Sequence, residues 1–151
     1  DAIEKLKERG FWDVSHENVL ILKKPILGVC IGMHLMASSS DEGHCEGLGW
    51  FKNRNVSKLS SAHDARVPHI GWNSVRVVSG CELVSNDITR YYYFLHSYKF
   101  DLSNDNTTIG HTDYNGSFCS VINHENIYGV QFHPEKSHEA GVKLLKNFSK
   151  I

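Results

Sequence analysis

The stretch that decides the fold is Ile26-Leu27-Gly28-Val29-Cys30-Ile31-Gly32-Met33-His34. It begins as an apolar run without polar alternation, which is typical of a strand buried on both faces. Helix-forming residues follow from Gly32 to Ala37, so the pattern predicts a strand, a sharp turn and a helix. Cys30 lies at this turn with a glycine two residues to either side, the arrangement of a nucleophile elbow. The N-terminus of the helix would favour the thiolate, whereas the plainer alternative is a buried structural cysteine.

A second segment, Gly129-Val130-Gln131-Phe132-His133-Pro134-Glu135, combines an apolar strand with a histidine and an acid. Residues two apart in an extended chain face the same side, so Glu135 can contact His133 while Pro134 ends the strand. A carboxylate beside an imidazole fixes its tautomer and supports its cationic form. Taken alone, such a pair is more often a solvated loop histidine next to a surface acid.

Cys30 and His133 each follow an apolar strand directly. Open α/β sheets collect their active-site groups at the carboxyl ends of their strands. We therefore expect Cys30, His133 and Glu135 to share one rim of a sheet.

The composition is that of one compact globular domain. The 151 residues are 40% hydrophobic, and 16 basic side chains nearly balance 17 acidic ones, which leaves no field that would attract nucleic acid or a membrane. There is no run of about 18 apolar residues for a membrane span. The start at Asp1 has no signal-peptide character, so we expect a cytoplasmic protein.

The cysteines and histidines do not form the usual metal or disulfide patterns. The four cysteines include no CxxC pair, and the ten histidines include no HExxH motif. We expect reduced thiols, no metal and no cofactor.

The remaining pattern alternates helices and short strands. Helices are expected in an opening segment that ends at Gly10, over Phe11 to Lys24, and over Ser137 to Ile151 with Ser137 as N-cap. Residues 38–43 read as a loop because they are rich in serine and end in glycine. Strands are expected at Ser74–Val78, Tyr91–Leu95, Phe118–Ile122 and Tyr128–Phe132.

Several motifs occur in the order of a known family. The sequence resembles the class I, or triad-type, glutamine amidotransferases, and among them the glutaminase subunits of imidazole glycerol phosphate synthases. The resemblance runs almost end to end. The matching segments are Gly28–His34, Gly47–Gly49, Pro68–Asn73, Tyr93–Tyr98 and Gly129–Ser137. The combination of the last three is the most specific part of the resemblance.

The resemblance implies a flavodoxin-like α/β fold, a mixed sheet flanked by helices, with residues 1–151 forming one type-1 glutamine amidotransferase domain. Members of the family also carry a β-rich N-terminal part that ends in a Pro-Gly-Val-Gly oxyanion loop, and this part has no counterpart here. We therefore expect a partial domain in which the strand from Ile26 to Cys30 has an unpaired edge. Self-association through that edge is the predicted consequence.

The family resemblance also implies catalytic roles. Cys30 would attack the amide carbon of glutamine, His133 would pass the proton to the leaving ammonia, and Glu135 would orient His133. The backbone N–H of Ile31 would be an oxyanion donor.

Substrate and partner residues follow from the same resemblance. Glu42 would contact the α-amino group of glutamine, although a solvated surface charge is an equal alternative. His34 stands where the family usually has glutamine, and imidazole lacks the paired geometry of an amide. Trp72 and Lys136 would face a (βα)8-barrel synthase, with a core role as the alternative for Trp72. The glutamine-binding set is Gly32, His34, Glu42, Ser97 and Tyr98.

The expected function is that of a glutaminase subunit that passes ammonia to a (βα)8-barrel synthase in histidine biosynthesis. One alternative keeps the chemistry but supplies ammonia for amidation of surface sugars. A second is a catalytically inactive, truncated interaction module. A third is a stand-alone cysteine hydrolase such as a γ-glutamyl peptidase.

Overall fold

The computed structural model describes residues 2–61, 66–85, 89–103 and 105–151. Its N-terminal helices are α1 (Ala2–Glu8) and α2 (Phe11–His16), followed by a π-helical turn, η1 (Glu17–Ile21). Gly10 separates α1 from α2 in the left-handed conformation, with a φ of 70°, which confirms it as a helix stop. The single helix predicted from Phe11 to Lys24 is wrong in its second half, where Leu22 N donates to Glu17 O, five residues back.

The centre of the molecule is a mixed sheet, as predicted. Its strands run in the order β3-β2-β4-β7-β9-β8-β5-β6, and β10 joins β9 to β1. The β1–β10 and β2–β4 pairs are parallel, and the other pairs are antiparallel. The strands are β1 (Ile26–Val29), β2 (Ala37–Ser40), β3 (Cys45–Glu46), β4 (Phe51–Lys58), β5 (His69–Val77), β6 (Thr89–His96), β7 (Tyr98–Phe100), β8 (Thr108–Asp113), β9 (Ser117–His124) and β10 (Ile127–Val130).

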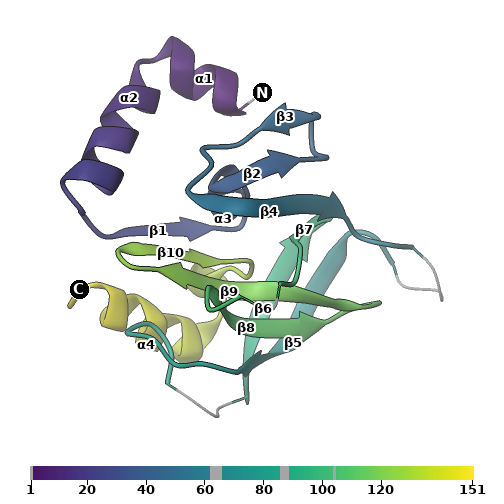
Figure 1. Cartoon of the computed structure of the whole chain (residues 1–151). Helices are drawn as coiled ribbons and strands as arrows, with labels where there is room; N and C mark the ends of the chain where they lie inside the picture. Colours follow the sequence, from purple (N-terminus) through teal and green to yellow (C-terminus); the bar gives the residue numbers. More distant parts are fainter. Residues whose placement is uncertain (1, 62–65, 86–88, 104) are drawn as a thin grey trace.

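Helices flank this sheet on both faces (Figure 1). The short helix α3 (Ile31–Leu35) follows β1, and α4 (His138–Phe148) follows a 3-10 turn, η3 (Pro134–Lys136). In Figure 1, α1 and α2 form an arch beyond β1. Among the described residues, no helix is both long and apolar enough to cross a membrane.

Strand β2 corrects the first half of the loop predicted at residues 38–43, whereas residues 41–43 form a turn, as predicted. Ser39 pairs with Asn55 of β4, and the Ser38 and Ser39 hydroxyls donate to Phe51 O and Asn55 Oδ1, at 3.1 and 2.8 Å. Serine favours turns because its hydroxyl bonds to nearby backbone, but here β4 supplies the partners. Tertiary pairing thus outweighs the local preference.

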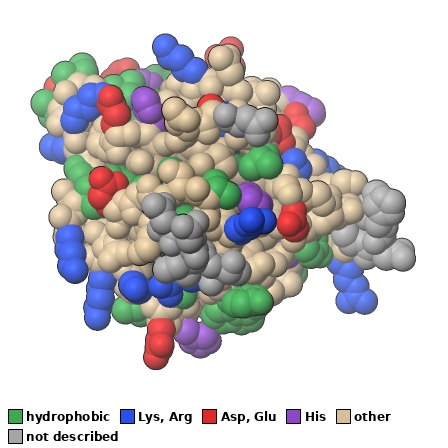
Figure 2. Space-filling model, turned by 60° about the horizontal axis from the view of Figure 1, so that its bottom comes forward, with side chains coloured by type: hydrophobic (Ala, Val, Ile, Leu, Met, Phe, Trp, Pro, Cys, Tyr) green, Lys and Arg blue, Asp and Glu red, His purple; other side chains and the backbone are tan. Residues whose placement is uncertain are grey.

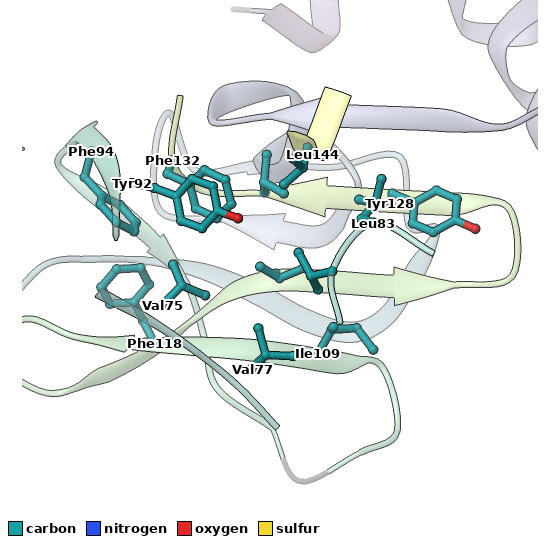
Figure 3. Close-up of a cluster of buried hydrophobic side chains, with 13 residues drawn as sticks. Val75, Val77, Leu83, Tyr92, Phe94, Ile109, Phe118, Tyr128, Phe132 and Leu144 are labelled. Carbon is teal, nitrogen blue, oxygen red and sulfur yellow. The ribbon is translucent and has the colours of Figure 1, made fainter. Parts of the chain in front are cut away.

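Two buried clusters fill the opposite faces of the sheet. The larger one packs aromatic residues of β6, β9 and β10 against Leu144 of α4, and Figure 3 shows Tyr92, Phe94 and Phe132 gathered in it. The other cluster contains Met33 of α3 and Val56 of β4. In β10, Tyr128 and Val130 belong to the first cluster and Ile127 to the second, as expected from the alternation of side chains along a strand.

Strands β1 and β10 hold the two motifs of interest side by side. They pair in parallel, with Val29 opposite Val130, and β10 pairs on its other edge with β9. Within the part of the chain that the structure describes, β1 pairs with β10 only, as predicted for its free edge. The carboxyl ends of β1 and β10 therefore emerge at the same rim.

Candidate active site

Cys30 occupies the turn between β1 and α3 in a strained conformation. Its φ of 51° and ψ of −109° lie outside the regions that residues with a side chain favour. The backbone holds it there, because Cys30 N donates to Val130 O at 2.8 Å and Cys30 O accepts from Met33 N and His34 N. The predicted sharp elbow is confirmed.

Of the two glycines beside the elbow, only Gly28 meets the tight packing that we predicted. A Cβ on Gly28 would lie 2.7 Å from backbone atoms of Gly32 and Met33. A Cβ on Gly32 would meet nothing within 4 Å. Gly28 thus lets α3 lie directly on β1, whereas Gly32 faces open space.

The Cys30 thiol is not paired with His133 in this structure. Its Sγ donates to Leu95 O at 3.7 Å and accepts from Gln131 Nε2 at 3.8 Å. Burial raises the pKa of Cys30, and a backbone hydrogen bond from Ile31 opposes this. The predicted bias toward thiolate is therefore wrong for the resting site, because desolvation outweighs the N–H at the start of the helix.

His133 and Glu135 form the predicted pair. His133 Nδ1 lies 2.7 Å from Glu135 Oε1, which makes Nδ1 the protonated nitrogen and leaves Nε2 as an acceptor. His133 Nε2 is buried and has no hydrogen-bond partner among the described residues. An imidazole with one nitrogen held by a carboxylate and the other free is arranged to take a proton.

The backbone around His133 is fixed from both sides. His133 N donates to Tyr93 O at 2.8 Å, and Ser137 Oγ donates to His133 O at 2.6 Å while accepting from Tyr93 N at 3.0 Å. Ser137 is the N-cap residue of α4, as predicted, but its side chain makes no capping hydrogen bond to the helix. Its buried hydroxyl joins β6 to the turn that carries His133.

A pocket of about 230 Å³ opens beside the elbow. Two of the five predicted glutamine-binding residues, His34 and Glu42, line it, whereas Gly32, Ser97 and Tyr98 are outside its lining. Ile31, the predicted oxyanion donor, and Cys45 also line it, together with other residues of α1, α3 and the β2–β3 region.

His34 is engaged within the protein rather than turned fully to this pocket. It is 5% exposed, and its Nε2 lies 2.7 Å from Gln131 Oε1. Its Nδ1 lies 3.8 Å from Glu42 Oε2, which is too far for a hydrogen bond. Contact with His34 lowers the pKa of Glu42, which is 44% exposed. Glu42 therefore combines a solvated position with a place in the pocket wall.

Ser97 and Tyr98 lie half-buried at the junction of β6 and β7, beside Leu95. The junction is held by two buried histidines: His69 Nδ1 lies 2.9 Å from His96 Nε2, and His96 Nδ1 donates to Tyr98 O at 2.7 Å. Burial lowers the pKa of His69 to about 4 and that of His96 to about 3. Both rings are therefore neutral at ordinary pH.

The predicted partner residues meet at the surface. Trp72 is 48% exposed, which contradicts the core alternative, and it stacks on His138 with ring centroids 5.2 Å apart. Tyr93 lies edge-on to Trp72, and Lys136 Nζ is 5.8 Å from the Tyr93 ring. Figure 2 shows charged side chains of both signs scattered between small hydrophobic areas, in keeping with the net charge of −1.

Two groups at the thiol were missed from the sequence. Leu95 contributes only a carbonyl, for which no sequence signal exists. Gln131 is a fully buried amide, and a signal was present: it is the one polar residue in the apolar stretch from Gly129 to Phe132. A buried polar side chain needs partners, so its position beside the elbow could have been inferred.

Comparisons with known proteins agree with this geometry. The family model for glutamine amidotransferase class-I matches residues 14–151. The chain is 44% identical to the imidazole glycerol phosphate synthase subunit HisH of Leptospira interrogans, covering 99% of this chain and 75% of that protein. It is 42% identical to subunit HisH 2 of Methanococcus maripaludis, covering 99% and 74%.

Solved structures show the same fold at low identity. A glutamine amidotransferase crystal structure matches with a TM-score of 0.66 at 15% identity, over 95% of this chain and 71% of that one. A glutamine amidotransferase from Thermotoga maritima matches with a TM-score of 0.61 at 19% identity, over 97% of this chain and 56% of that one. These likenesses confirm the predicted flavodoxin-like fold class, and the chain belongs to the class-I glutamine amidotransferase family of enzymes.

Proposed function

We propose that residues 1–151 form a type-1 glutamine amidotransferase domain that acts as the glutaminase of an imidazole glycerol phosphate synthase in histidine biosynthesis. The observation that carries this proposal is the meeting of a strained cysteine elbow and a carboxylate-paired histidine at one rim, where β1 and β10 end in parallel register. The identity of 44% to a synthase subunit supports the synthase over the other ammonia acceptors considered.

In the proposed reaction, the Cys30 thiol gives its proton to His133 Nε2, and the sulfur attacks the amide carbon of glutamine. Glu135 stabilises the imidazolium through Nδ1, at the 2.7 Å contact. His133 then protonates the departing ammonia, which leaves a γ-glutamyl thioester on Cys30. Water attacks the thioester, His133 takes its proton and returns it to the sulfur, and glutamate leaves.

The thiol must first turn away from Leu95 O, its acceptor in the resting structure. Negative charge then develops on the former amide oxygen, and the backbone N–H of Ile31 is the proposed donor for it. A single preorganised donor of this kind is worth roughly 10²–10³ in rate.

The pocket beside the elbow is the proposed glutamine site. Glu42 would accept a hydrogen bond from the α-ammonium group of glutamine. Contact with His34 lowers the pKa of Glu42, which keeps its carboxylate ionised. His34 Nδ1 is its remaining free nitrogen. Gly32, Ser97 and Tyr98 would complete the site from the neighbouring segments.

Ammonia would pass to a (βα)8-barrel synthase subunit that docks on the aromatic surface formed by Trp72, Tyr93, Lys136 and His138. An exposed tryptophan stacked on a second ring is a suitable interface anchor. The proposed compartment is the cytoplasm, where reducing conditions keep a catalytic thiol free.

The test is glutamate release from glutamine with the barrel subunit present, for the parent chain and for Cys30→Ala. We expect Cys30→Ala to lose at least about 10³-fold in turnover. Cys81→Ala is the matched control, because Cys81 is half-buried beside the α4-side cluster and should leave turnover unchanged. Turnover by Cys30→Ala close to that of the parent chain would refute the proposed function.

A further inference from the structure

One buried amide connects the nucleophile to the pocket wall. Gln131 is 0% exposed, and its two ends have different partners: Oε1 lies 2.7 Å from His34 Nε2, and Nε2 lies 3.8 Å from Cys30 Sγ. The Gln131 backbone N–H donates to Ser120 O at 3.0 Å, which fixes the side chain at its base. These contacts join α3, the end of β10 and the elbow.

The orientation of the Gln131 amide indicates which nitrogen of His34 carries a proton: because Oε1 accepts at 2.7 Å, His34 Nε2 is the donor. An amide has one accepting end and one donating end. With His34 Nε2–H donating to Oε1, the NH2 group of Gln131 must face the sulfur. A thiolate accepts hydrogen bonds but cannot donate them, so this orientation is the one that stabilises ionised Cys30.

We propose that Gln131 is a positioning residue for the nucleophile, and that His34 acts through Gln131 by holding its NH2 group toward the Cys30 sulfur. This inference rests on the proposed function in that it gives Cys30 the catalytic role. It gives His34 a role other than binding glutamine, because His34 Nε2 is already hydrogen-bonded to Gln131 Oε1.

Two carboxylates oppose the effect of Gln131 at the sulfur. Glu42, from the pocket, and Glu135, beyond β10, both raise the pKa of Cys30, while the hydrogen bond from Gln131 lowers it. His133, on the side of β10, is the proton acceptor in the reaction, and Leu95 O of β6 holds the thiol proton at rest. Together with the backbone N–H of Ile31, the Gln131 side chain is thus a neutral donor that opposes burial and the two carboxylates at the sulfur.

The experiment measures the rate of Cys30 alkylation by iodoacetamide against pH, resolved by peptide mass spectrometry, without glutamine or a partner. Gln131→Leu should move the profile to higher pH and slow alkylation at neutral pH roughly tenfold, the effect of one hydrogen bond to a charged group. His34→Leu should move it in the same direction by less. His34→Gln should keep the parent profile, because the side-chain N–H of glutamine can also donate to Gln131 Oε1.

The double variant His34→Leu/Gln131→Leu separates coupling from independent effects. If His34 acts through Gln131, the double variant should alkylate at the rate of Gln131→Leu alone, rather than at the product of the two losses. Should Gln131→Leu fail to fold in a thermal melt, Gln131→Glu is of the same size and replaces the donor by an acceptor. Its profile should shift to higher pH at least as far.

Steady-state kinetics with the barrel subunit give an independent readout. Gln131 is not among the lining residues of the glutamine pocket, so Gln131→Leu should lower kcat about tenfold and leave KM nearly unchanged. Unchanged alkylation profiles in both Gln131 variants would overturn the inference while leaving the role of Cys30 intact. Loss of turnover in Cys30→Ala tests that role separately.

Discussion

The two halves of the candidate site differ in how firmly the chain holds them. On the base side, β10 is buried at all four positions and pairs on both edges. On the nucleophile side, β1 is fully buried only at Gly28, and in the described part of the chain it pairs with β10 alone.

The contacts of the two side chains follow the same contrast. His133 has a short bond to Glu135, and its backbone is tied to Tyr93 and Ser137. The side-chain contacts of the Cys30 sulfur to Leu95 O and Gln131 Nε2 are long, at 3.7 and 3.8 Å. The proposed base is therefore preformed, whereas the proposed nucleophile has a preformed backbone and a side chain that must still be activated.

The largest expected effect comes from breaking the preformed side. His133→Ala should lower glutaminase kcat on the order of 10²–10⁴-fold, because it removes the general base and acid. Glu135→Gln should cost less, since an amide oxygen can still accept from Nδ1–H at the same place. Turnover with the barrel subunit measures both, and a greater loss in Glu135→Gln would contradict a supporting role for that acid.

The next largest effect is a loss of folding stability in acid, caused by the buried pair His69 and His96. Their pKa values of about 4 and about 3 lie below the ordinary value of 6.5. Between these values and pH 6.5, the two histidines are protonated in the unfolded chain and neutral in the folded chain. Their contribution to stability is complete above pH 6.5 and is lost as the pH falls toward the folded values. The slope should approach about 1.4 kcal/mol per pH unit for each histidine.

Urea unfolding between pH 6.5 and 5 isolates this effect, because carboxylates titrate mainly below that range. His69→Phe keeps the ring stacking on Phe94 and Tyr114 and removes one titrating group, so it should flatten the slope. A free energy of unfolding that does not change over this range in the parent chain would contradict neutral buried histidines.

The nucleophile side can be disrupted at Gly28, where the backbone of β1 packs closely against that of α3. Gly28→Ala should lower the free energy of unfolding by about 1–3 kcal/mol, because the new Cβ would lie 2.7 Å from backbone of α3. Gly32→Ala is the matched control in the same elbow; with nothing within 4 Å, it should be neutral or stabilise by up to about 1 kcal/mol. Equal losses in the two variants would rule out close packing as the cause.

The smallest effect concerns the free edge of β1. We expect residues 1–151 to self-associate through that edge, and light scattering at increasing concentration should show a mass above that of the monomer. Ile21 is 74% exposed at the end of η1, the element that precedes β1, so Ile21→Lys should weaken association. Tyr91→Lys, at the 63% exposed Tyr91 on β6, should not. A strictly monomeric mass at high concentration would contradict this prediction.

Local signals explain which parts of this account could be predicted from the sequence. The elbow at Cys30 and the His133–Glu135 pair depend on residues close together in the chain, and both predictions are confirmed. The strand at Ser39 and the bridging role of Ser137 depend on partners far away in sequence. The local preference of serine for loops and helix caps does not reveal such partners. The state of the Cys30 thiol was misjudged for the same reason, because burial is set by the whole fold.

The most direct test of the central claim is covalent labelling of the parent chain with a chloroketone analogue of glutamine. The reagent carries the substrate's own groups, so it selects a nucleophile beside a glutamine pocket rather than the most exposed thiol. Peptide mass spectrometry should find the adduct on Cys30 and not on the other free thiols, Cys45, Cys81 and Cys119. Adduct on Cys45, the cysteine that lines the pocket, or on either of the others in place of Cys30 would contradict the assignment of the nucleophile.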